Sequence, residues 1–198
     1  MARTPNPDRP EALLDSIIEY LTTHGVADVS LRPLAKAVDA SPRTLLYYFG
    51  SKEMLVARAL ARLRERQRAS FAQLQQSATL SSREVCLAIW RQLSSPESEP
   101  LFRLFVQAYS MGLQQPQRYA AFLHHAIEDW LEFLAAPRIA AGESTAAARA
   151  FATLVLAGFR GFMLDYCASH NRARVDAAVE LWLQSLDAIA PAHGGGSS

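Results

Sequence analysis

Apolar residues recur along this chain at the three- and four-residue spacing of amphipathic helices. Between residues 10 and 24 they form one stripe, made of Leu13, Leu14, Ile17, Ile18 and Leu21. Gly25 follows the stripe, where helices commonly end in a left-handed residue. No segment shows the sustained alternation of apolar and polar residues, bounded by turn residues, that indicates a strand. The sequence therefore predicts an all-α protein.

The same spacing predicts six more helices after residue 50. They cover residues 51–76, 81–93, 101–112, 116–136, 143–169 and 172–190. Breaks with polar residues or prolines separate some of them, at residues 94–100 and 137–142. The two ends of the chain, residues 1–9 and 191–198, are expected to be a disordered arm and a disordered tail.

Residues 30–52 predict two short helices joined by a tight turn. Ser30 can cap the first helix, whose apolar face consists of Leu31, Leu34, Ala35 and Val38. Asp39 lies in the turn, and aspartate tolerates a left-handed backbone better than most residues other than glycine. Ser41 can cap the second helix, and Pro42 suits its first position because the missing N–H has no helical partner there. This arrangement is a helix-turn-helix, whose second helix can lie in the DNA major groove.

Further residues around the motif fit a known pattern. They are Thr23-His24-Gly25, Ser30, Leu34-Ala35, Ser41, Thr44-Leu45, Tyr48-Phe49 and Ser51-Lys52. Together they resemble the DNA-binding domain of the TetR family of bacterial transcriptional regulators, over about residues 10–60. The resemblance implies a three-helix DNA-binding domain at residues 10–56 and a helical ligand-binding and dimerisation domain at residues 57–190.

The chain departs from the family pattern at two positions of the motif. The family usually has glycine where this chain has Asp39, and a backbone-contacting tyrosine where it has Leu46. Tyr47, next to Leu46, can supply a substitute for the missing hydroxyl.

The chemistry of the motif predicts which side chains contact DNA. Arginine pairs bidentately with guanine and the threonine methyl can contact a thymine methyl, so we expect base readout from Arg32, Arg43 and Thr44. Phosphate contacts are expected from Ser30, Tyr47, Tyr48 and Lys52, together with helix N-termini. Ser41 completes the predicted DNA-binding set.

The last two predicted helices indicate a dimer. Residues 172–190 carry one long apolar stripe, whereas the helix before it is apolar on two sides. A helix with two apolar sides must bury both, one in its own domain and the other against a second subunit. Gly158 and Gly161 would let another helix approach closely, and TetR relatives pair these two helices in a four-helix bundle. The expected interface residues are Phe159, Val175, Val179, Trp182 and Leu186; a monomeric core is the alternative.

Large aromatic residues between the fifth and eighth helices suggest a ligand pocket. Apolar walls with a few polar groups are typical of small-molecule sites, although ordinary core packing is the alternative for each residue. The expected ligand-binding residues are Trp90, Phe102, Phe105, Tyr109, Tyr119, Phe122, His125, Trp130, Phe162, Met163 and Tyr166. We expect a small, mostly apolar effector with one polar end near Arg160, Asp165 or His125.

Composition adds little to these motifs. The formal net charge is +1, so charge alone gives no argument for nucleic acid. Residues 1–70 hold eleven Arg and Lys against eight Asp and Glu, a mild basic bias. No apolar run approaches the roughly 18 residues of a membrane span, so no membrane partner is expected. Cys86 and Cys167 are expected to be free thiols in a reducing cytoplasm.

Signals for an enzyme are weak. His124 and His125 lie within one helical turn of Glu128 and Asp129, and metal ligands at this spacing are possible. No third ligand stands at a recognisable spacing, and no phosphate loop, nucleophile elbow or catalytic cysteine motif occurs. We therefore predict no catalytic residue, no metal and no cofactor.

These observations predict a DNA-binding transcriptional regulator in the cytoplasm of a bacterium, at the nucleoid. It would be a homodimeric repressor, released from a palindromic operator by its effector. One alternative is a helical ligand-binding or interaction protein without its own operator, for which Leu46 is a signal. The other is a small all-helical enzyme using His124 and His125.

Overall fold

The computed structural model describes residues 9–26, 29–75 and 82–187, and these ranges contain nine helices and no strand. The helices are α1 (Arg9–His24), α2 (Leu31–Ala37), α3 (Pro42–Phe49), α4 (Lys52–Gln75), α5 (Ser82–Leu93), α6 (Glu99–Gln114), α7 (Ala120–Ala140), α8 (Thr145–Ser169) and α9 (Arg172–Asp187). The all-α prediction is confirmed. The predicted tail and residues 1–8 of the predicted arm lie outside the described residues, whereas Arg9 begins α1.

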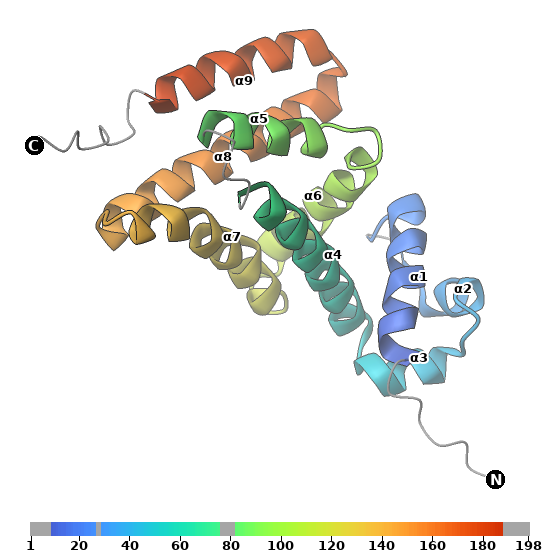
Figure 1. The fold of residues 1–198 in the computed structure, drawn as a ribbon. Coiled ribbons are helices and arrows are strands. Elements are labelled where there is room, and N and C mark those ends of the chain that lie inside the picture. The colour runs from blue at the N-terminus through green and yellow to red at the C-terminus, as the bar shows by residue number, and fades with distance from the viewer. Residues whose placement is uncertain (1–8, 27–28, 76–81, 188–198) are drawn as a thin grey trace, which may run out of the picture.

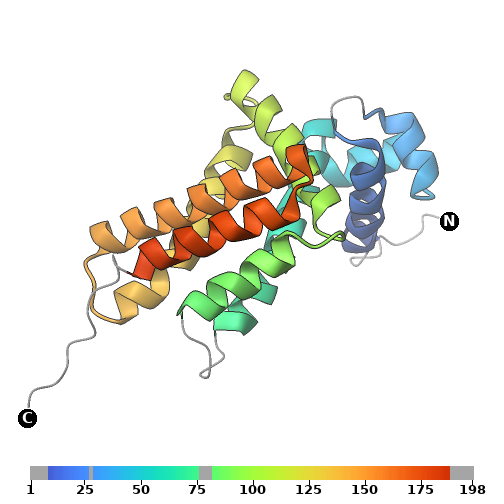
Figure 2. The same cartoon turned by 90° about the horizontal axis from the view of Figure 1, so that it is seen from above.

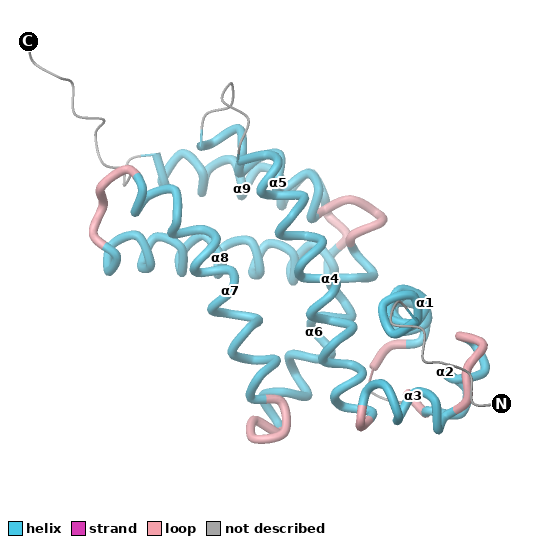
Figure 3. The backbone as a smooth tube through the Cα atoms, turned by 60° about the horizontal axis from the view of Figure 1, so that its bottom comes forward, coloured by secondary structure: helices cyan, strands magenta, loops and turns pink. Residues whose placement is uncertain are grey.

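The helices form two lobes joined by α4. Figure 1 shows α1, α2 and α3 together at one end, with α4 leading from α3 into the group formed by α5 to α9. Figure 3 shows the same separation from another side. Helix α4 therefore crosses the predicted domain boundary between residues 56 and 57.

Two main apolar cores stabilise the fold, and the first of them joins the two lobes. The first contains the buried residues of α1 to α4 and continues into α6 and α7 through Leu104, Ala108, Tyr119, Phe122 and Ala126. The second joins α4 and α5 to α8 and α9 around residues such as Phe71, Trp90 and Phe159. Because the first core includes residues of α6 and α7, the small N-terminal lobe is packed directly against the larger one.

Local sequence explains the turn of the helix-turn-helix. Asp39 has a positive φ of 48°, and Gly25 after α1 has a φ of 76°, as the sequence predicted for both positions. The Ser41 hydroxyl accepts a hydrogen bond from the Thr44 N–H at 3.0 Å and caps α3. Ser30 occupies the cap position of α2 but its side chain makes no capping hydrogen bond.

The sequence prediction placed both ends of α7 wrongly, because it used prolines as boundaries. Helix α7 continues through Pro137 to Ala140. Pro137 has no N–H to donate, but its carbonyl accepts a hydrogen bond from the Ala141 N–H at 3.1 Å. Pro116 does not begin α7, which starts at Ala120 after a turn. In that turn the Tyr119 N–H bonds to the Gln115 carbonyl at 3.2 Å.

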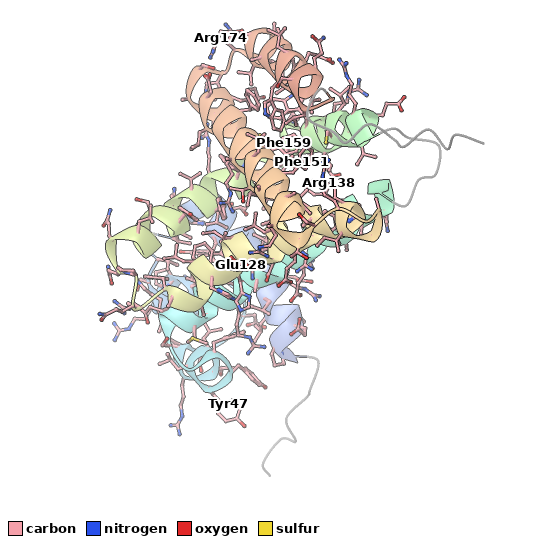
Figure 4. The ribbon with its side chains drawn as sticks, turned by 90° about the vertical axis from the view of Figure 1, so that its left-hand side faces the viewer. Tyr47, Glu128, Arg138, Phe151, Phe159 and Arg174 are labelled. Atoms are coloured by element: carbon pink, nitrogen blue, oxygen red, sulfur yellow. The ribbon has the colours of Figure 1, made fainter. Side chains whose placement is uncertain are left out.

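Helix α8 is long and apolar. Its 25 residues include a window of mean hydropathy 1.4, which satisfies the length and composition of a membrane span, so the expectation that no such run exists was wrong. In the structure α8 packs along α7, where Arg149 pairs with Glu128 at 2.5 Å and the Arg138 guanidinium lies 3.9 Å from the Phe151 ring centre (Figure 4). Within the chain 28% of the apolar window is buried, and Leu154 and Leu164 of α8 are exposed.

Candidate functional site

The helix-turn-helix is held rigidly on its inner side. Leu34 of α2 and Leu45 and Phe49 of α3 are buried in the first core. The Arg58 guanidinium of α4 lies 5.2 Å from the Phe49 ring centre and donates to the Tyr48 carbonyl at 3.3 Å. These contacts fix α3 relative to the start of α4.

The outer side of the motif is exposed and carries basic and aromatic residues. Tyr47 is 72% exposed, and Figure 4 shows it at the tip of the molecule, far from Phe159 and Arg174. Arg32 and Arg43 are exposed as well, on α2 and α3. Arg32 and Lys36 line a shallow surface depression with Asp39 and Pro42. Lys36 was missed by the sequence prediction, although its position one turn after Arg32 on α2 could have indicated it.

The remaining predicted DNA-binding residues have structural partners or are partly covered. The hydroxyls of Ser41 and Thr44 are hydrogen-bonded to each other at 2.8 Å. Lys52 Nζ donates to the Val29 carbonyl at 3.1 Å, which uses one of its three donors. Tyr48 is half-buried against the first core, with its ring 5.2 Å from that of Tyr47, whereas Ser30 is exposed.

Most of the arginines on α4 face acids of α1. Arg62 lies 3.4 Å from Glu11, and Arg66 lies 2.5 Å from Asp15. These pairs are half-exposed and individually weak, but they join the first helix to α4.

A cavity lies where the two cores meet. It measures about 110 Å³ and is lined by residues of α4, α5, α6, α7 and α8. The lining residues are Leu60, Leu63, Arg64, Gln67, Phe71, Leu93, Leu101, Phe102, Phe105, Phe122, Trp130, Leu156, Phe159, Arg160 and Met163. Five of the predicted ligand-binding residues are among them: Phe102, Phe105, Phe122, Trp130 and Met163.

The other six predicted ligand-binding residues do not line this cavity. Trp90 is buried and donates from Nε1 to Asp176 at 2.6 Å, and Phe162 packs between Trp90 and Trp182. Tyr119 is buried in the first core, and His125 is exposed and paired with Asp129 at 3.1 Å.

The last two of these six, Tyr109 and Tyr166, also have partners elsewhere. The ring centre of Tyr109 lies 5.5 Å from the guanidinium carbon of Arg160, and that of Tyr166 lies 5.9 Å from the guanidinium carbon of Arg172. Asp165, which we expected near the polar end of a ligand, pairs instead with Arg174 at 2.9 Å.

Sequence reasoning missed the contribution of α4 to the cavity. Leu60, Leu63, Gln67 and Phe71 recur at three- and four-residue spacing, which places them on one face. Arg64 of the same helix also lines the cavity and pairs with Asp129 of α7 at 2.9 Å.

Arg160 is the second arginine in the cavity wall. Burial lowers its pKa from the ordinary value. Its guanidinium lies 5.2 Å from the Phe105 ring centre and donates a hydrogen bond to the Ala126 carbonyl.

Four of the predicted dimer residues are core residues of the chain itself. Phe159, Val175, Val179 and Leu186 are buried between α8, α9 and their neighbours, because the apolar stripe of α9 faces α8 of the same chain. Trp182 lies against Phe159 and Phe162, with ring centres 5.3 Å apart in both pairs.

A different set of apolar residues faces outward on the same two helices. Figure 2 shows α8 and α9 side by side, with no helix covering them in that view. Leu154 and Leu164 of α8 and Leu181 of α9 are exposed, and nothing lies within 4 Å of a Cβ built on Gly161. We call Leu154, Gly161, Leu164 and Leu181 the outer face.

Metal-binding geometry is not found in the described ranges. No group of three His, Cys, Asp or Glu side chains there is placed to hold an ion. His124 and His125 are exposed, with their ring centres 5.3 Å apart.

Comparisons with known proteins agree with this architecture. Residues 13–59 match the family described as bacterial regulatory proteins, tetR family. No curated protein matches the sequence. Several solved structures are similar over nearly the whole chain.

A TetR transcriptional regulator from Legionella pneumophila has a TM-score of 0.67 at 16% identity, covering 93% of this chain and 99% of its own. Salmonella enterica GusR has a TM-score of 0.72 at 20% identity, covering 93% and 98%. A transcriptional regulator from Rhodococcus sp. Rha1 has a TM-score of 0.72 at 20% identity, covering 89% and 94%. The chain therefore carries the DNA-binding domain of the TetR family at residues 13–59, and its described residues have the fold of a TetR-family transcriptional regulator.

Proposed function

We propose that this protein is a dimeric repressor of transcription that leaves a palindromic operator when a small, mostly apolar molecule enters the cavity. The observation that carries the proposal is the exposed face of the helix-turn-helix. Arg32, Lys36, Arg43 and Tyr47 are exposed there, on a domain of the TetR family. A regulator of this kind acts in the cytoplasm, at the nucleoid.

The exposed residues suit two tasks on DNA. Arg43, at the second position of α3, is available for bidentate pairing with guanine, and the Thr44 methyl remains free for a thymine methyl. Arg32 of α2 is a further candidate for base readout, whereas Tyr47 and Lys36 can bind phosphates and set the register of α3 in the groove. In this role Tyr47 supplies the hydroxyl that a tyrosine usually provides in the family at the position of Leu46.

Dimerisation would use the outer face. Leu181 of α9 and Leu154 and Leu164 of α8 are exposed, and nothing lies within 4 Å of a Cβ built on Gly161, so a helix of a second copy could approach α8 there. Covering this surface in a two-fold dimer would place two helix-turn-helix motifs at a fixed separation.

The cavity can influence the separation of the two helix-turn-helix motifs through α4 and α6. Leu60 of α4 and Phe105 of α6 belong to the core of the DNA-binding lobe and also line the cavity. A ligand that moves α4 or α6 therefore shifts the DNA-binding lobe. Ligand sites usually measure about 300 to 1,000 Å³. The present volume of about 110 Å³ is smaller, so the walls must open for most ligands. Release then requires that the ligand binds the opened shape more tightly than the DNA-bound shape.

A gel-shift assay with fragments of genomic DNA, run across a salt series, tests the proposal. We expect preferred fragments, with affinity that falls steeply as salt rises. Arg43→Ala should lose about 1–3 kcal/mol on the preferred fragment and less on random DNA. Arg91→Ala, a change of an exposed arginine on α5, is the matched control and should bind like the wild type. Binding that shows no preference among fragments would favour a ligand-binding protein without its own operator.

A further inference from the structure

The charges in the cavity wall are unbalanced. Arg64 and Arg160 line the cavity, together with Gln67 and apolar residues, and no aspartate or glutamate is among the lining residues. Arg64 has its counterion outside the wall, because its Nε lies 2.9 Å from Asp129 Oδ2. Within the described part of the chain, Arg160 forms no ion pair with a carboxylate.

The contacts of Arg160 hold its guanidinium in place without neutralising it. One nitrogen donates to the backbone carbonyl of Ala126 in α7. The rings of Phe105 and Tyr109 lie on α6, with centres 5.2 Å and 5.5 Å from the guanidinium carbon. A guanidinium has five N–H donors, so the Ala126 carbonyl and the Tyr109 hydroxyl, which also accepts a hydrogen bond from it, still leave donors available.

A charge in this position is unfavourable unless it is compensated. Removing a cation from water costs free energy, and the cost is recovered when an anion with hydrogen-bond acceptors lies beside it. Burial lowers the pKa of Arg160, because removal from water disfavours the charged guanidinium. Arginine nevertheless stays protonated in proteins, so the charge remains to be compensated. An apolar cation in the same cavity would meet two arginines and would be repelled.

We propose that the effector is a small apolar carboxylic acid whose carboxylate pairs with Arg160 while its apolar part fills the space between Phe102, Phe105, Trp130 and Met163. A carboxylate matches the two parallel N–H groups of a guanidinium, which gives a bidentate pair. This inference rests on the proposed function, because it names the ligand class of the same cavity, but the binding it predicts does not require DNA.

The size of the cavity limits which carboxylic acids can enter it. A dry apolar cavity of about 150 Å³ accepts benzene. The cavity here, at about 110 Å³, therefore needs only a small movement of its aromatic walls to accept a single ring or a short alkyl chain. Benzoate and hexanoate are suitable probes, with benzamide and hexanamide as uncharged partners of nearly the same shape.

Calorimetric titration of the full-length protein with these four probes tests the proposal. We expect each acid to bind the wild type at least ten-fold more tightly than its amide. Arg160→Met keeps much of the side-chain volume and should abolish that preference, and Arg160→Lys should retain part of it. The matched control is Arg91→Met, outside the cavity, which should preserve the preference. Helical content and thermal unfolding of each variant, followed by circular dichroism, show whether it is folded.

The wild-type comparison decides the question even if Arg160→Met does not fold. Equal or tighter binding of the amides, or no binding of either acid at millimolar concentration, would overturn the proposal. The gel-shift assay keeps the two claims apart. A protein that selects DNA but prefers the amides refutes only the carboxylate inference. A protein that prefers the acids but selects no DNA refutes only the regulator.

Discussion

The side-chain oxygen of Gln107 in α6 accepts a hydrogen bond from the backbone N–H of Val26, at 3.0 Å, just after the end of α1. The same oxygen lies only 2.7 Å from the position a Cβ would take on Gly25, so a side chain there would displace the Gln107 amide; the positive φ of Gly25 separately favours glycine. Helix α6 also carries Phe102 and Phe105 into the cavity. Gln107 thus connects a cavity helix to the linker that precedes the helix-turn-helix.

Loss of this hydrogen bond should weaken the fold. Gln107→Ala would leave the N–H of Val26, a buried residue, without its partner, and we expect the free energy of unfolding to fall by about 1–3 kcal/mol. Urea denaturation followed by circular dichroism measures the change. Gln114→Ala, at the exposed end of α6, is the control and should unfold like the wild type. Identical midpoints for the two variants would show that the bond contributes nothing.

Two glycines of α8 should respond oppositely to the same substitution. A Cβ on Gly158 would lie 2.4 Å from the Trp182 ring, so Gly158→Ala should push α9 away and cost about 1–3 kcal/mol of stability. A Cβ on Gly161 has nothing within 4 Å, so Gly161→Ala should preserve the fold of the chain or stabilise it by up to about 1 kcal/mol. Thermal unfolding at a concentration that keeps both variants monomeric compares them. A larger loss for Gly161→Ala would mean that the α8–α9 packing is wrong.

The outer face should mediate dimerisation. Leu181 is 68% exposed, so Leu181→Asp should leave the chain folded but place a charge at the proposed interface. Sedimentation velocity should then show monomers where the wild type shows dimers. Leu113→Asp is the control, because Leu113 is a similarly exposed leucine on α6, outside the outer face. Dimers of unchanged strength for Leu181→Asp would remove the outer face as the interface.

Asp129 should make the α4–α7 contact sensitive to acid. Burial acts to raise the pKa of Asp129, but hydrogen bonds from His125 and Arg64 outweigh it and hold the pKa below the ordinary value of 3.8. A lowered pKa in the folded state stabilises the protein above the ordinary value and loses this effect as the pH falls through the lowered one. The difference in unfolding free energy between the wild type and Asp129→Asn should therefore be present at pH 7 and shrink below about pH 4.

Denaturation series at several pH values test this, with Glu132→Gln as the control on the exposed side of α7. A difference between the wild type and Asp129→Asn that does not change with pH would contradict the role of the ionised carboxylate.

Local patterns predicted the secondary structure well because each signal acts within a few residues. The cap at Ser41 and the left-handed backbone at Asp39 depend on neighbours in the sequence. Proline failed as a boundary signal at Pro137, because α7 continues to Ala140 although Pro137 has no N–H to donate to the helix.

Tertiary packing could not be predicted in the same way. Apolar spacing shows that α9 has a buried face but not what covers it, so Val179 was assigned to a partner although it is buried in the second core of its own chain. Aromatic content likewise suggested a pocket without showing which rings reach it. Trp90 bonds to Asp176 in the core, and Leu63 of α4 lines the cavity instead.

The most direct test of a dimeric DNA-binding regulator is selection of binding sites from random DNA, followed by footprinting of the preferred site. A two-fold dimer presents two copies of α3, so we predict a protected inverted repeat whose half-sites are separated by about whole turns of DNA. Adding a cavity ligand should remove the protection from both halves together. A preferred site without two-fold symmetry, or no preferred site at all, would contradict the proposal that this protein is a dimeric regulator.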